Sequence, residues 1–118
     1  MKTLGMTATL AISAICLVLA APAAAATPQQ CAAMSLDAQC QQQGNGFYAK
    51  NHHAAVCAQF AQMPAITVSQ AFQQALDAVG AADPDMPLPV RGSAVGASVG
   101  LYCDEYRGAL QEYLGSAP

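Results

Sequence analysis

The sequence predicts an all-α domain: a small disulfide-crosslinked bundle of about four helices. Apolar residues recur at steps of three and four along 47–63, 68–79 and 95–113, the spacing that places them on one face of a helix. The pattern T-x-x-Q occurs at Thr27 and Thr67, where the hydroxyl and the glutamine can form a helix-capping box. Two disulfides predicted from four of the cysteines would supply the crosslinks in so short a chain.

The first 26 residues predict a secretory signal peptide. Lys2 precedes an apolar run over 8–21, and Ala24-x-Ala26 is a suitable cleavage site. The run is too short for a transmembrane helix, which needs about 20 apolar residues. We therefore expect a signal peptide at 1–26, a single small helical domain at 27–118, and a secreted protein in the extracellular space, the periplasm or the cell envelope.

Charge excludes one class of partner. Lys50, Arg91 and Arg107 are the basic residues of 27–118. Seven acidic residues oppose them, for a formal charge of minus four with histidine neutral: Asp37, Asp77, Asp83, Asp85, Asp104, Glu105 and Glu112. Three scattered cations could not neutralise a row of phosphates, so we expect no nucleic-acid partner. The positive mean hydropathy comes largely from 1–26, so we do not expect an integral membrane protein.

The four cysteines of 27–118 are Cys31, Cys40, Cys57 and Cys103. They can pair in three ways, and we favour Cys31–Cys40 with Cys57–Cys103. Closing the long loop would contribute about 4 kcal/mol and the short loop about 2.5 kcal/mol on the chain-entropy estimate. A metal site is disfavoured because no C-x-x-C pair occurs and export favours oxidation.

The first half of the domain is expected to hold three helical segments. Thr27 and Pro28 start a short helix that runs to about Met34 and carries Cys31. The stretch 35–43 forms a second short helix or a capped turn, and 44–46 a loop. The apolar stripe of 47–63 predicts a longer helix, which Pro64 ends because proline lacks an N–H.

The second half is expected to be helix, loop, helix. Thr67 opens a helix that Gly80 ends, and the proline-rich stretch 81–90 forms a connector. The closing helix spans 89–114, with Ser93 as its N-cap and Gly115 as its stop. The apolar face of this helix consists of Val95, Val99, Tyr102, Tyr106, Leu110 and Tyr113. Because three internal glycines weaken this helix, it needs tertiary support, which a bridge at Cys103 would supply.

Over 46–110 the chain resembles a family of small secreted proteins of mycobacteria and related actinobacteria, domain-of-unknown-function family 732. The matching features are the signal peptide, the V-C pair at Val56-Cys57, an amphipathic helix over 68–79 and a closing Y-C-x-x-Y at 102–106. The family usually has proline after the last cysteine, where this chain has Asp104, and Cys31 and Cys40 are additional. The resemblance implies a Cys57–Cys103 bridge across an all-helical domain, with no established activity.

A weaker resemblance is to the periplasmic immunity proteins that neutralise cell-wall-degrading effectors of type VI secretion. It rests on the C-x8-C spacing of Cys31 and Cys40, the T-x-x-Q helix start and a closing helix that ends in cysteine. The distance from Cys57 to Thr67 is long for that pattern. This resemblance implies an inhibitor of a hydrolase.

Four residues are candidates for ligand binding. Tyr48 and His52 share a helix face at i and i+4, an arrangement that could hold haem iron. Tyr102 and Tyr106 lie on the stripe of the closing helix, and they would form a patch for a protein or lipid if that helix were only partly covered. The simpler interpretation is that His53 is half-buried, that His52 lies in solvent, and that the tyrosines belong to the core.

We predict that the protein is not an enzyme, because no activated nucleophile, facing acid–base pair or metal-ligand set is evident. The sequence favours a secreted non-enzymatic binding or interaction protein without catalytic residues, resident metal or cofactor. Its partner is an unknown protein or a small apolar ligand. The alternatives are a periplasmic immunity-type inhibitor of a hydrolase, and a haem or lipid carrier with an enclosed pocket lined by Phe47, Tyr48, Phe60 or Phe72.

Overall fold

The computed structural model describes residues 26–33, 38–41 and 44–116, so the predicted signal peptide lies outside the described residues except for Ala26. The described residues form helices and turns and contain no strand, which confirms the all-α prediction. Two short helices come first, α1 (Pro28–Ala33) and α2 (Ala38–Gln41). The larger helices are α3 (Asn45–Phe60), α4 (Val68–Ala82), α5 (Leu88–Tyr102) and α6 (Arg107–Ser116).

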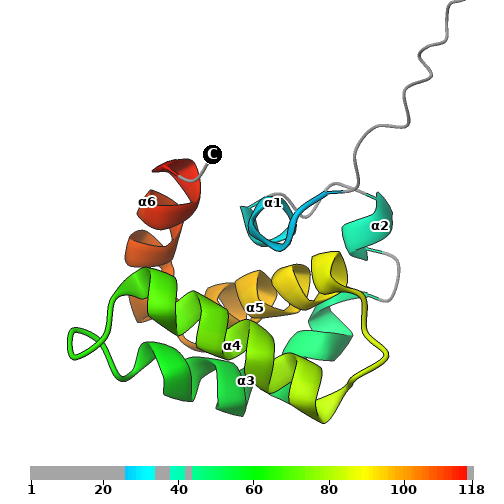
Figure 1. Ribbon diagram of the computed structural model, residues 1–118, viewed down its shortest axis with the longest axis horizontal. Coiled ribbons are helices and arrows are strands. Elements are labelled where there is room, and N and C mark those ends of the chain that lie inside the picture. Colours follow the sequence, from blue (N-terminus) through cyan, green and yellow to red (C-terminus); the bar gives the residue numbers. More distant parts are fainter. Residues whose placement is uncertain (1–25, 34–37, 42–43, 117–118) are drawn as a thin grey trace, which may run out of the picture.

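Helix α5 lies at the centre of the arrangement (Figure 1). Helices α3 and α4 pack against one side of it, and α1 and α2 lie on the other side. Helix α6 contacts both α1 and α4, so it closes one end of the bundle. The other long helices are therefore arranged around α5 and the turn that follows it.

The hydrophobic core lies between α3, α4 and α5. Phe60 of α3, Phe72 of α4 and Val95 of α5 are fully buried in one cluster, and Leu110 of α6 joins it. Burying a side chain such as Phe72 contributes about 1.5–3 kcal/mol. The apolar stripes expected for 47–63 and 68–79 are thus the core faces of α3 and α4.

Both predicted capping boxes are present. At Thr67, Oγ1 accepts from the Gln70 backbone N–H at 3.1 Å, and Gln70 Oε1 accepts from the Thr67 N–H at 2.8 Å. Thr27 and Gln30 form the same pair of bonds at 3.1 and 2.8 Å. These caps need only a four-residue pattern, which is why the sequence located both helix starts.

The predicted disulfide pairing is confirmed. Cys31 bonds Cys40 and thereby ties α1 to α2. Cys57 of α3 bonds Cys103, the residue directly after α5, across a sequence separation of 46. The long bridge therefore fixes one end of the central helix to its neighbour.

The closing helix is not continuous, contrary to the prediction. Helix α5 ends at Tyr102, Cys103 adopts a non-helical conformation with φ −145° and ψ 58°, and a short 3-10 turn over Asp104–Tyr106 leads into α6. The break lies at the bridge to Cys57. It changes the direction of the chain, and Leu110 of α6 then joins the core.

Several other predicted helix boundaries are also wrong. Helix α3 begins within the predicted 44–46 loop and ends at Phe60, before the predicted stop at Pro64. Ser93 is not an N-cap, because α5 starts at Leu88 and Ser93 is buried within it. Gly115 does not end α6, which continues to Ser116. Gly80 does not end α4, which continues to Ala82; the connector is correspondingly shorter than 81–90.

Gly80 has a packing role instead. A side chain at this position would overlap the guanidinium of Arg91. Arg91 Nε donates to the Met86 carbonyl at 2.8 Å and Nη2 donates to the Pro84 carbonyl at 3.1 Å. The glycine therefore makes room for an arginine that holds the α4–α5 connection closed.

Helix α1 lies directly on the backbone of α5. A Cβ on Gly92 would overlap the Pro28 carbonyl, and one on Gly96 would lie 2.5 Å from the Ala32 carbonyl oxygen. Such contacts are too short for any side chain, so the two glycines permit the close approach. The first helix is held both by this contact and by the Cys31–Cys40 bond.

Candidate functional site

Tyr48 and His52 do lie together on α3. Their rings are stacked with centroids 6.2 Å apart, and both side chains are half-buried. His52 is therefore less exposed than expected. Within the described residues, no cluster of three histidine, cysteine or acidic side chains is arranged to hold a metal ion. The pair could present one tyrosine and one histidine to a ligand at the surface.

Tyr102 and Tyr106 lie in different surroundings. Tyr102 stacks on His53 of α3, with ring centroids 4.0 Å apart and planes inclined by 10°. Tyr106 is half-buried and stacks on Phe60, 6.2 Å away, at the edge of the core. The break after α5 separates the two tyrosines, so the predicted continuous tyrosine stripe does not form.

The two pockets described below do not have the aromatic lining that the carrier hypothesis predicts. Phe60 and Phe72 are fully buried in the packed core. Phe47 lies at the surface with 62 % of its area exposed. Neither pocket is lined by these three residues or by Tyr48.

Two exposed large hydrophobic side chains occupy the end of α5, Leu101 and Tyr102, and we call them the α5-end cluster. Leu101 is 66 % exposed and Tyr102 is 47 % exposed. Cys103 directly follows Tyr102, and its bond to Cys57 ties this end of α5 to α3. These apolar side chains are thus displayed on a rigid backbone instead of a loop.

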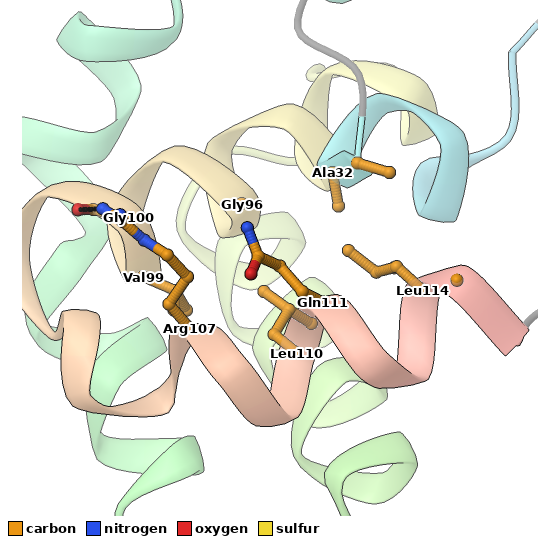
Figure 2. Close-up of a pocket in the computed structure, with 10 residues that line it drawn as sticks. Ala32, Gly96, Val99, Gly100, Arg107, Leu110, Gln111 and Leu114 are labelled. Carbon is orange, nitrogen blue, oxygen red and sulfur yellow. Dashed lines mark hydrogen bonds between the residues drawn. The ribbon is translucent and has the colours of Figure 1, made fainter.

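A first pocket, here called the α6 pocket, lies between α1, α5 and α6 and has a volume of about 270 Å³. Figure 2 shows Ala32, Leu110 and Leu114 turned toward one another around it. Gly96, Val99 and Gly100 form its α5 wall, and the amide of Gln111 is directed toward Gly96. The walls are mostly apolar and contain small residues.

Arg107 lies at one end of the α6 pocket. Its Nη2 donates to the Gly100 carbonyl at 2.6 Å (Figure 2). Carbonyls in the last turn of a helix have no partner within the helix, so this arginine satisfies one of them. The guanidinium has further N–H donors and is exposed, so the pocket combines apolar walls with a cationic end.

A second pocket, the α3 pocket, lies on another side of α1 and has a volume of about 230 Å³. Its walls come from the end of α1, the first turn of α3 and the Ser93–Leu101 part of α5. Asn45 Oδ1 and Ser93 Oγ are buried beside it and have no hydrogen-bond partner in the described part of the chain. It is the more polar of the two pockets.

Sequence reasoning missed both pockets. Their shared wall consists of Ala32, Ala33 and Gly96, residues that carry no reactive group. The signal that could have located them is the spacing of Gly92, Gly96 and Gly100, which places a strip without side chains along one face of α5. Helix α1 covers part of this strip, and the pockets flank it.

Comparison with known proteins adds no relative. No protein-family model matches the chain, and neither a curated protein nor a solved structure matches it significantly. In the portion that the structure describes, no helix has both the length and the apolar character needed to cross a bilayer.

Proposed function

We propose that the protein is exported and acts as a non-enzymatic binding module in the cell envelope or outside the cell. The observation that carries this proposal is the α5-end cluster. Leu101 and Tyr102 are consecutive, exposed and held next to the Cys57–Cys103 bridge. Apolar and aromatic side chains fixed at a surface favour association with another protein, because burying them gains free energy without first ordering them.

The two sequence resemblances give the proposal its biological setting. Membership in family 732 is supported by the Cys57–Cys103 bridge across a helical domain, the feature that this resemblance implies. An envelope hydrolase is the partner class that the immunity-protein resemblance favours. Export is supported by the leader-like pattern of 1–26 and by the two disulfides.

Native mass spectrometry of the protein from its host's exported fraction tests export and binding together. We expect cleavage after Ala26, a mass lower by the four hydrogens lost in two disulfides, and a retained protein companion. Replacing Leu101 and Tyr102 by alanine should release that companion. Leu88→Ala is the matched control, because Leu88 is 54 % exposed at the opposite end of α5; equal loss in the control would contradict the assigned surface.

A second function is supported by the α6 pocket. The pocket has a volume of about 270 Å³, mostly apolar walls and Arg107 at one end. These features suit a short acyl chain that carries a carboxylate. The carrier role, an alternative in the sequence analysis, would thus use α1, α5 and α6 and not the predicted aromatic residues of α3 and α4.

Calorimetry with decanoate and decanol tests this carrier role. Decanoate should bind more tightly than decanol to the native protein, and Arg107→Gln should remove the difference. Equal binding of the two compounds to the native protein would mean that Arg107 has no part in recognition.

A further inference from the structure

The α3 pocket has two buried polar atoms that the protein does not satisfy. Ser93 is only 2 % exposed, and its Oγ has no partner in the described portion of the protein. Asn45 Oδ1 is also a buried atom without a hydrogen-bond partner in the described residues. Burying an unpaired polar group is unfavourable, and native proteins pair nearly all such groups with protein, water or ligand. Both residues line the pocket, so a partner for them can enter there.

A neighbouring serine shows that the unpaired state of Ser93 is not a general property of α5. Ser98 lies five residues further along the same helix and is also buried. Its Oγ donates to the Ala94 carbonyl at 2.7 Å and is thereby satisfied inside the helix. Ser93 instead faces the pocket with its hydroxyl available.

The α3 wall of the pocket adds hydrogen-bond donors. Asn45 and Gly46 are the first two residues of a 16-residue helix, and both line the pocket. The N-cap residue Gly44 provides no side-chain bond to the first turn. The N–H groups at the start of a helix lack partners within it and carry partial positive charge. Acceptor atoms of a ligand would be favoured at this wall.

The polar groups of the α3 pocket together define the chemistry of the ligand. Asn45 Oδ1 requires a donor, whereas the Ser93 hydroxyl and the start of α3 can donate to an acceptor. Among the residues that the structure describes, no charged side chain lines the pocket, and Ala97 and Leu101 give it apolar surface. A carboxamide offers an N–H donor and a C=O acceptor, both attached to one carbon, without net charge. We propose that the α3 pocket binds the carboxamide group of a small uncharged molecule, such as an acetamido substituent.

Titration of the isotope-labelled protein with acetamide and with N-acetylglucosamine, followed by amide chemical shifts, tests the proposal. We expect saturable shifts at Asn45, Gly46, Ala97 and Leu101, with a dissociation constant of about 1–10 mM for a fragment as small as acetamide. Tighter binding of the sugar would identify an acetamido sugar as the source, and equal binding would identify the amide alone. Glucose and acetate are the controls, because each lacks the carboxamide.

Variants separate recognition from folding. Ser93→Ala should weaken acetamide binding about fivefold, the effect of one neutral hydrogen bond. Ala97→Leu should fill the pocket and abolish binding. Ser98→Ala is the matched control: it removes a hydroxyl from the same helix outside the pocket, and binding should be unchanged.

Three results would overturn the proposal. The first is the absence of saturable shifts with either amide probe in the native protein. The second is equal binding of acetate or glucose at the same residues. The third is a crystal structure at saturating acetamide in which only an ordered water joins Asn45 Oδ1 to Ser93 Oγ.

Discussion

Helices α3 and α4 pack against the same side of α5, but they differ in how their first turns are capped and in which aromatic side chains they bury. Helix α4 starts at the Thr67 capping box and buries a regular stripe that includes Phe72 and Val79. Helix α3 starts at Gly44 without a side-chain cap, and it leaves Phe47 exposed. Helix α4 thus serves the core, whereas α3 also carries candidate binding groups.

The difference at the helix starts comes from Gly44, the N-cap residue of α3. Its φ of 79° lies in the left-handed region that glycine adopts readily. The position thus favours a turn residue over a capping hydroxyl, and the start of α3 is left to other partners. In α4 the same positions are occupied by Thr67 and Gln70, which satisfy the helix locally.

The largest contrast should appear between two phenylalanines. Phe72→Ala should lower the free energy of unfolding by about 3–5 kcal/mol, because it opens a cavity in the core. Phe47→Ala should change it by less than about 0.5 kcal/mol, because the side chain is largely exposed. Chemical denaturation of both variants with the disulfides intact checks the pair. Similar losses would mean that α3 is held as firmly at its start as α4.

The two disulfides should differ in the same sense. Replacing Cys57 and Cys103 together by alanine should lower stability by about 4 kcal/mol, and replacing Cys31 and Cys40 by about 2.5 kcal/mol, because the longer loop restricts the unfolded chain more. Thermal unfolding of the two double variants measures both. A greater loss from the short bridge would show that the contact of α1 with α5 depends on that bridge.

The capping box of α4 should be worth less. Thr67→Ala should lower the free energy of unfolding by about 1 kcal/mol, since the Gln70 N–H loses its acceptor. Thr67→Ser retains the hydroxyl and should stay near the native value. If serine and alanine are equally destabilising, the methyl group and not the cap accounts for the effect.

The smallest contrast concerns the two buried serines of α5. Ser98→Ala should lower stability by about 1 kcal/mol, because its hydroxyl is hydrogen-bonded. Ser93→Ala should leave stability unchanged or raise it, because an unpaired polar atom is removed. Denaturation of the ligand-free protein distinguishes these outcomes. A loss at Ser93 equal to that at Ser98 would indicate that its hydroxyl is satisfied in solution.

Features set by a few neighbouring residues could be predicted from the sequence. The Thr67 box is one example. The even number of cysteines predicts two disulfides, but the sequence left three pairings open, and the structure shows the favoured one. Gly80 was misassigned as a cap because tertiary packing overrides local preference there: Arg91 packs on Gly80, and this contact has no signal in the neighbouring sequence. Ser93 was misassigned because α5 begins at Leu88, where a proline in the first turn is the local signal that was missed.

The candidate sites were predicted less well for the same reason. Tyr48 and His52 were placed together correctly because i and i+4 residues share a helix face. The stacking of Tyr102 on His53 depends on how α5 crosses α3, which spacing along one helix cannot give. The pockets depend on how closely α1 approaches α5, and this distance is set by glycines that have no side chain to attract notice.

The approach of α1 to Gly92 and Gly96 has a consequence for both pockets. Ala32, Ala33 and Gly96 line the α6 pocket on one side and the α3 pocket on the other. A displacement of α1 would therefore change the two volumes together. If a ligand in one pocket shifts α1, it alters the affinity of the other pocket by some factor, and thermodynamic linkage requires the second ligand to alter the first affinity by the same factor.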